Sequence, residues 1–348
     1  MKKTIITLIQ FGIAGFLLWY VYSGEDPEKL MNTLKAADLS WVTLGFLAFG
    51  ILVISGILRW WILLRAQDIH LTVKRTSGLF LIGYFFNQFI PGSTGGDIIK
   101  LYYVVKETHT KKSAAFLSVI VDRIMGLLGL MVIALVFILW RYDWLMGNET
   151  IRPDVLIFIG FLAAAVLGIV GAFIFANLGL VDKILPKWTP LREKFIEMAE
   201  AFVVYGKAWR HTLTALCLAI IGHLAIFFSF LLCARSVTKE LDATDLFSVM
   251  PMINTAASLP IAPGGVGVRD ALFVRYLGEL CATPSEIAGA IAIITYAIMV
   301  AWGLIGGVIY PFYRSGTPSH LSETDVDKVE DEDELIDHGE DGSQAEKV

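Results

Sequence analysis

Two short segments place charged residues directly after helix-breaking residues, inside otherwise apolar stretches. One is N-Q-F-I-P-G-S-T-G-G-D-I-I-K at residues 87–100, and the other is N-T-A-A-S-L-P-I-A-P-G-G-V-G-V-R-D at residues 254–270. Proline removes a backbone donor and glycine disfavours helix, so each segment should contain a break after which a new helix starts. The free N–H groups and the dipole at a helix N-terminus attract phosphate or carboxylate. Anion binding is therefore the chemistry that these segments predict.

The two segments also share one spacing, P-x-x-x-G-G-x-x-x-[KR], and an Asn precedes each proline. A matched pattern of this kind indicates an internal repeat, and paired breaks in two halves of a membrane protein point to its binding site. The candidate binding residues of the first segment are Asn87, Pro91, Gly95, Gly96, Asp97 and Lys100. Those of the second segment are Asn254, Pro260, Pro263, Gly264, Gly265, Gly267, Arg269 and Asp270.

Asp122 and Arg123 complete the set of candidate binding residues. They follow Lys112 by some ten residues within an apolar run, which at helical rise is about 15 Å into a bilayer. Ionisable residues at that depth are costly and usually face a water-filled cavity or a partner, so we expect them to be functional. Arg123 is the more informative of the two, because its fork matches phosphate geometry. The structural alternative is a buried network that locks the helix against a hairpin.

Helix capping is the alternative for the acids after the breaks. Thr94 and Asp97 fit a capping box, and Asp270 can act similarly with Gly267 at the cap. Asn87 and Asn254 have two possible roles as well, since their amides can hydrogen-bond the broken backbone or the headgroup of a ligand. Backbone satisfaction is the preferred interpretation for both.

Composition places the chain among multi-spanning membrane proteins. Hydrophobic residues make up 56% and charged residues 18%, and the mean hydropathy is +0.66. The three cysteines and six histidines lack metal-ligand spacing, and neither a P-loop nor a G-x-S-x-G elbow is present. We therefore expect no metal, no other cofactor, no nucleic-acid partner and no soluble-enzyme activity.

An all-α polytopic fold with about six spanning helices and two re-entrant helical hairpins follows from the apolar runs. The hairpins are expected at about Ser77–Val105 and Ala243–Cys281. The expected spans are Thr4–Tyr22, Leu39–Leu64, Ser113–Trp140, Val155–Asn177, Thr212–Ala234 and Ile287–Phe312.

Basic residues give the orientation, because cytoplasmic loops carry the excess of Lys and Arg. With both termini in the cytoplasm, most basic residues between the spans fall inside, and the two hairpins fall on opposite sides of the membrane. The repeat is therefore predicted to be inverted, with halves at about 39–140 and 210–312. An amphipathic connector at 181–209 joins them within a transmembrane domain of residues 1–318. Residues 319–348 are predicted to form a disordered acidic cytoplasmic tail, which could bind a partner.

These segments resemble the flippase-like transmembrane region of lysylphosphatidylglycerol synthases. The resemblance rests on residues 87–100, on V-D-R-I-M-G-L-L-G-L at 121–130 and on L-P-I-A-P-G-G-V-G-V-R-D at 259–270. It implies movement of lipid across a bacterial inner membrane and argues against lipid aminoacylation, which belongs to a separate soluble domain in that family. Asp270 and Lys100 depart from the family pattern, where Glu and Arg are common, and this affects the expected headgroup contact.

The expected function is therefore flippase-like lipid transport, in which an anionic phospholipid or polyprenyl-phosphate headgroup binds between the two hairpins. Membrane lipids are the expected partners, and a homo-oligomer or a membrane partner is compatible with the sequence. Two alternatives stay open. One is an intramembrane enzyme that acts on a lipid-linked substrate, and the other is a partner subunit that does not transport.

Overall fold

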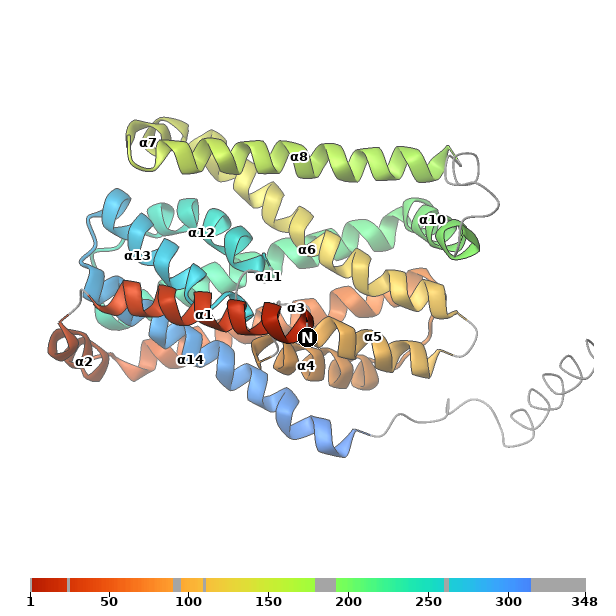
Figure 1. Ribbon diagram of the computed structural model, residues 1–348, viewed down its shortest axis with the longest axis horizontal. Coiled ribbons are helices and arrows are strands. Elements are labelled where there is room, and N and C mark those ends of the chain that lie inside the picture. Colours follow the sequence, from red (N-terminus) through yellow and green to blue (C-terminus); the bar gives the residue numbers. More distant parts are fainter. Residues whose placement is uncertain are drawn as a thin grey trace, which may run out of the picture. The chain divides into compact units, whose positions relative to one another are not determined.

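A computed structural model of the chain describes residues 2–23, 26–89, 95–108, 111–178, 192–259 and 263–313. Residues Met1–Phe312 form one unit, and the described residues contain helices and no strand. The all-α prediction is thus confirmed. Figure 1 shows the helices in chain order. Their bounds are α1 Lys2–Ser23, α2 Pro27–Lys35, α3 Leu39–Ala66, α4 Val73–Phe89, α5 Gly95–Glu107, α6 Lys112–Trp140, α7 Tyr142–Gly147, α8 Arg152–Asn177, α10 Arg192–Lys207, α11 Trp209–Val237, α12 Ala243–Ser258, η1 Pro263–Gly265, α13 Val268–Cys281, α14 Ser285–Ile309 and η2 Tyr310–Phe312.

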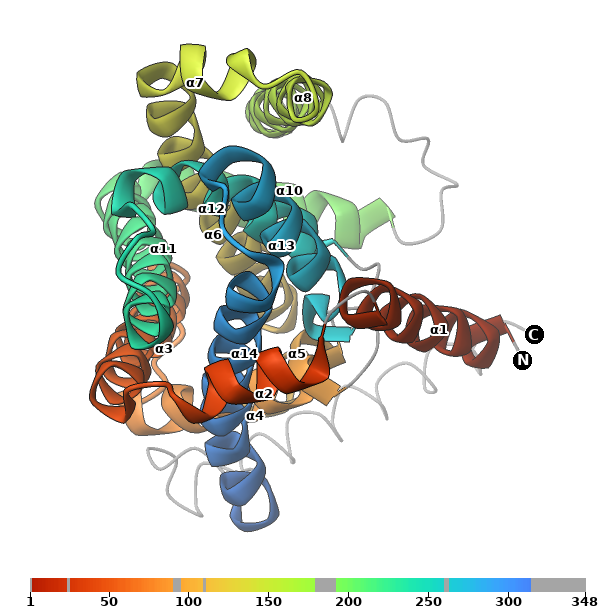
Figure 2. The same ribbon diagram turned by 90° about the vertical axis from the view of Figure 1, so that its left-hand side faces the viewer.

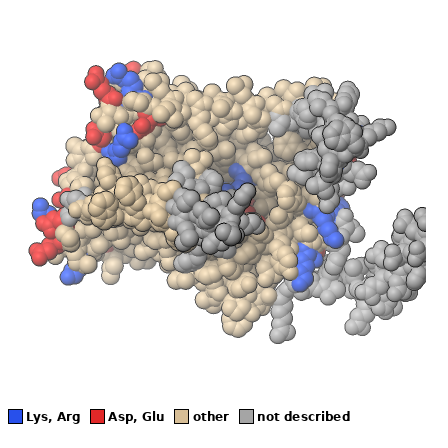
Figure 3. Space-filling model, in the orientation of Figure 1, with Lys and Arg blue, Asp and Glu red and all other residues tan. Residues whose placement is uncertain are grey.

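Five of these helices are long and apolar enough to cross a membrane: α3, α6, α8, α11 and the last helix at Ser285–Phe312. Each matches an expected span to within about one helical turn. The sixth expected span, Thr4–Tyr22, corresponds to α1, which is not among the five and stays a prediction as a span. On the face shown in Figure 3, side chains of both charges gather at one end, Lys and Arg side chains lie toward the other, and the surface between them is uncharged apart from a few atoms near its centre.

The same arrangement of helices occurs twice. A long helix, two short helices and another long helix follow one another in α3–α6 and again in α11–α14. The packing repeats too, because α4 packs against α14 as α12 packs against α6, and α3 packs most extensively against its counterpart α11. In Figure 1 the pair α4 and α5 lies toward one end of the bundle, and α12 and α13 lie toward the other.

Helices α3 and α11 run antiparallel. Ser229 Oγ donates to the carbonyl of Gly45 at 2.8 Å, and further along α3 Leu52 lies against Gly222. Residue numbers thus rise along α3 while those of the contacting residues on α11 fall, as expected for two antiparallel helices. Figure 2, a view along the bundle, shows α3 and α11 side by side and α8 at the edge.

Glycines permit both breaks between the short helices. In the second break the backbone of Gly264, Gly265 and Gly267 has φ values of 57°, 72° and 79°, a region that side chains with a Cβ rarely adopt. In the first break, a Cβ on Gly96 would lie 1.7 Å from the carbonyl oxygen of Gly83. Glycine at position 96 therefore lets α5 pack directly on the backbone of α4.

Candidate functional site

A cavity of about 440 Å³ lies at the centre of the bundle. Both halves line it, and the first half provides Arg59 of α3, Asn87 of α4 and Arg123 of α6. The second half provides His223 of α11, Asn254 of α12, Gly264 of η1 and Arg269 of α13. Apolar side chains such as Leu52, Leu127, Leu130 and Ile226 cover the rest of the wall. A few polar groups thus converge in an apolar pocket, as is typical of a ligand site.

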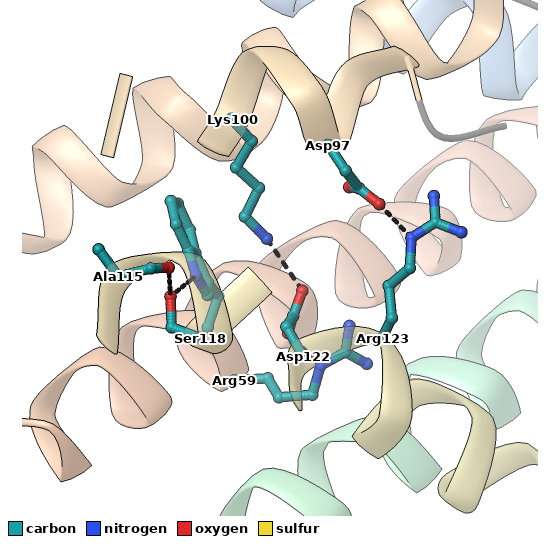
Figure 4. Close-up of polar contacts among 8 residues, drawn as sticks. Arg59, Asp97, Lys100, Ala115, Ser118, Asp122 and Arg123 are labelled. Atoms are coloured by element: carbon teal, nitrogen blue, oxygen red, sulfur yellow. Dashed lines mark hydrogen bonds and ion pairs between the residues drawn. The ribbon is translucent and has the colours of Figure 1, made fainter. Parts of the chain in front are cut away.

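Asp122 holds two cations beside this cavity (Figure 4). Its Oδ1 accepts from Nε of Arg59 at 2.7 Å, and its Oδ2 accepts from Nζ of Lys100 at 2.9 Å. Lys100 also lies over the ring of Trp60, 3.9 Å from the ring centroid. All of these groups except Arg59 are buried. The network ties α3, α5 and α6 together, in accord with the structural alternative predicted for Asp122.

Arg123 points away from Asp122 and forms an ion pair with Asp97 of α5 (Figure 4). Neighbouring residues on a helix face different directions, so Asp122 and Arg123 have separate partners. The Arg123 side chain is 41% exposed and that of Asp97 is 20% exposed. This ion pair is thus partly open, whereas the Asp122 network is closed.

Arg269 differs from the two other arginines of the cavity. Among the described residues, no carboxylate forms an ion pair with it. Its Nη1 lies 3.2 Å from the sulfur of Met299, while its Nε is buried and has no hydrogen-bond partner in the described part of the chain. The Nδ2 of Asn254 is also buried without a hydrogen-bond partner among the described residues. Among the buried, unpartnered atoms of the cavity wall these are the two N–H donors, and they favour a ligand that accepts hydrogen bonds.

The capping interpretation holds for one of the two acids after the breaks. Gly267 is the N-cap of α13, and its N–H donates to Oδ2 of Asp270 at 2.8 Å. Asp270 is buried and does not line the cavity. For Asp97 the proposed partner Thr94 lies outside the described residues, so its capping role stays a prediction; the carboxylate forms an ion pair with Arg123.

The structure separates the other predicted residues into two groups. Asn87 lines the cavity and also accepts from the backbone N–H of Gly96 at 2.9 Å, so it satisfies the broken backbone as expected. Gly95, Gly96 and Lys100 are buried in helix packing, and Gly265 lies against the backbone of Ala257. Pro91 and Pro260 lie outside the described residues, as does the side chain of Pro263.

Sequence reasoning missed Arg59 and His223. Arg59 is an ionisable residue inside the apolar run of α3, and this is the signal that could have identified it. His223 is likewise an ionisable residue inside an apolar run, that of α11. Its Nε2 donates to the carbonyl of Gly126 at 2.9 Å. Among the described residues, no group of three or more His, Cys, Asp or Glu is placed to hold a metal ion.

Comparison with known proteins gives a consistent result. Residues 7–307 match the family described as the lysylphosphatidylglycerol synthase TM region. A UPF0104 membrane protein of Pyrococcus horikoshii is 29% identical over 173 residues, which cover 49% of this chain and 48% of that relative. A UPF0104 membrane protein of Methanothermobacter thermautotrophicus is 22% identical over 93% of this chain and 99% of its own length. One from Methanocaldococcus jannaschii is 22% identical over 88% of this chain and 95% of its own.

Proposed function

Because the chain belongs to the family of the lysylphosphatidylglycerol synthase transmembrane region, we propose that it moves an anionic lipid across the membrane. The lipid is a phospholipid or a polyprenyl phosphate whose headgroup binds in the central cavity. In this proposal, α4–α5 and α12–α13 are re-entrant hairpins that approach the cavity from opposite faces of an inner membrane. Both chain termini are then cytoplasmic.

The unpaired guanidinium of Arg269 is the observation that carries the proposal. A charged group in a membrane protein normally has a partner, because an isolated charge in apolar surroundings is costly. Arg59 and Arg123 have such partners in Asp122 and Asp97, whereas no described carboxylate pairs with Arg269. A bound phosphate would supply the missing negative charge and accept from both Arg269 and the amide of Asn254.

The position of Arg269 strengthens this site for an anion. It is the second residue of α13, whose N-terminus lies at the break between α12 and α13. The partial positive charge of that helix end adds to the charge of the guanidinium, and Asp270 in the same turn offsets part of it. Apolar side chains of the cavity wall would contact the first atoms of the lipid chains, while the headgroup stays at Arg269.

Transport by the purified protein in liposomes tests the proposal. Fluorescent phosphatidylglycerol, phosphatidylcholine and a polyprenyl phosphate are compared, with dithionite to bleach label in the outer leaflet. Movement of an anionic lipid should exceed that in empty liposomes. Arg269→Gln should slow this movement about tenfold or more, because a hydrogen bond to a charged group is lost. Arg275→Gln is the matched control, since Arg275 lies on the same helix, is half exposed and pairs with Asp154.

Other results would favour the alternative functions. Equal movement with and without protein would reject transport, and normal movement by the Arg269→Gln variant would reject the role of Arg269. Chemical conversion of the added lipid, followed by mass spectrometry, would instead indicate an intramembrane enzyme. A protein that neither moves nor converts lipid would fit a partner subunit.

A further inference from the structure

A second depression, the α5–α6 groove, lies between these two helices and shares no lining residue with the central cavity. Its volume is about 630 Å³. Its apolar lining consists of Ile98, Leu101, Tyr102, Val105 and Phe116. Ile98 and Tyr102 are among the exposed large hydrophobic residues, at 64% and 61% exposure. The groove is therefore open to the surroundings of the helix bundle and suits a hydrocarbon chain.

Two lysines complete the lining, Lys106 in the last turn of α5 and Lys112 at the start of α6. Both are exposed, and neither forms an ion pair with an acid of the described residues. The neighbouring acid Glu107 is buried, with Arg75 at 3.8 Å. The two ammonium groups are thus available to an anion from outside the chain. A groove with an apolar body and a cationic end matches an amphiphile with a negative headgroup.

The α6 side of the groove leads toward the Asp97–Arg123 ion pair. Lys112, Phe116, Ile120 and Arg123 follow one another at spacings of four, four and three residues, so they share one face of α6. The distance from Lys112 to Arg123 along the helix is about 16 Å, roughly half of a hydrocarbon core. On α5, Ile98 of the groove directly follows Asp97. One helix face therefore carries a cation at each end of an apolar path.

We infer that the α5–α6 groove is the lateral entrance through which an anionic membrane lipid reaches the central cavity. Lys106 and Lys112 hold the phosphate first, while the lipid chains occupy the apolar lining. The phosphate then replaces the Asp97 carboxylate as the ion-pair partner of Arg123. Because Arg123 lines the central cavity, this exchange brings the headgroup to the cavity. This inference rests on the proposed function, and it assigns the groove to lipid from the leaflet that adjoins the α5–α6 end of the protein.

Photocrosslinking in nanodiscs tests the entrance. The full chain is embedded in phosphatidylcholine that contains a small fraction of phosphatidylglycerol with a photoreactive acyl chain, and labelled peptides are identified by mass spectrometry. Label should concentrate on residues 98–105 and around Phe116. In the double variant Lys106→Gln/Lys112→Gln it should fall about fivefold or more, given the contribution of one lysine near an anionic lipid. The control is Lys74→Gln/Lys207→Gln, two exposed lysines that do not line the groove.

The lipid dependence and the transport rate decide between the two proposals. Equal labelling of the groove by photoreactive phosphatidylcholine, or unchanged labelling in the Lys106→Gln/Lys112→Gln variant, would overturn the entrance. Transport by the wild type with no label in the groove would overturn it as well, while the proposed function survives. Selective labelling of the groove in a protein that moves no lipid would leave the anionic-lipid site standing and reject transport.

Discussion

At the scale of single residues, the charged groups beside the cavity pair with one another: Asp122 with Arg59 and Lys100, and Asp97 with Arg123. The sequence marked four of these five residues as candidates, but it did not indicate which of them pair. The partners depend on helix rotation and on which helices meet, and a one-dimensional pattern contains neither. Arg269 was recognised as one member of a repeated motif, yet its lack of a described carboxylate partner became visible only in three dimensions.

Asp122 offers a test of the closed network. Asp122→Asn removes the negative charge that Arg59 and Lys100 share, so the buried ammonium of Lys100 and the half-buried guanidinium of Arg59 both lose their carboxylate partner. Breaking a buried pair of this kind costs about 3 kcal/mol or more. The variant should therefore unfold at a clearly lower temperature in detergent, as followed by circular dichroism. Asp143→Asn, at an exposed position of α7, should melt like the wild type; equal melting of both variants would show that the network contributes no stability.

At the scale of helices, the apolar runs and the breaks were predictable because length and composition determine them. The ends of the five long helices agree with the sequence prediction to within about one turn. The structural role of individual glycines could not be predicted from the sequence in the same way. Gly96 was expected to be a ligand-binding residue, whereas a Cβ at this position would point at the backbone of Gly83. Only the packing of α5 on α4 reveals that this glycine serves a helix contact.

The Gly83–Gly96 contact predicts a strong effect of one methyl group. Gly96→Ala would place a Cβ 1.7 Å from the carbonyl oxygen of Gly83, so α4 and α5 must separate. Overpacking of this kind typically costs about 1–3 kcal/mol, and a backbone atom cannot move aside as a side chain can. Gly160→Ala, on α8, meets nothing within 4 Å and is the control. Thermal unfolding should separate the two variants, and an equally stable Gly96→Ala variant would disprove the close packing.

At the scale of the whole molecule, the repeat was predictable from two matched motifs, while its packing was not. The motif P-x-x-x-G-G-x-x-x-[KR] located equivalent breaks, and the basic residues indicated opposite orientations. The extensive packing of α3 against α11 is not predicted by any short sequence motif. It depends on the complementary surfaces of two long apolar helices, whose small residues Gly45 and Gly222 allow them to approach closely.

The orientation in the membrane yields the last prediction. Lys74 lies at the start of α4 and Lys239 shortly before α12, so they occupy equivalent places in the two halves, and both are exposed. An inverted repeat puts these equivalent places on opposite sides of the membrane. Single cysteines are introduced into a variant without Cys217, Cys233 and Cys281. Positions 74 and 207 are expected on the cytoplasmic side, and positions 149 and 239 on the outer side. In intact cells a membrane-impermeant maleimide should label positions 149 and 239 only, and permeabilised cells should show label at all four. Labelling of positions 74 and 239 from the same side would reject the inverted repeat. A two-fold axis in the membrane plane could then not relate α3–α6 to α11–α14.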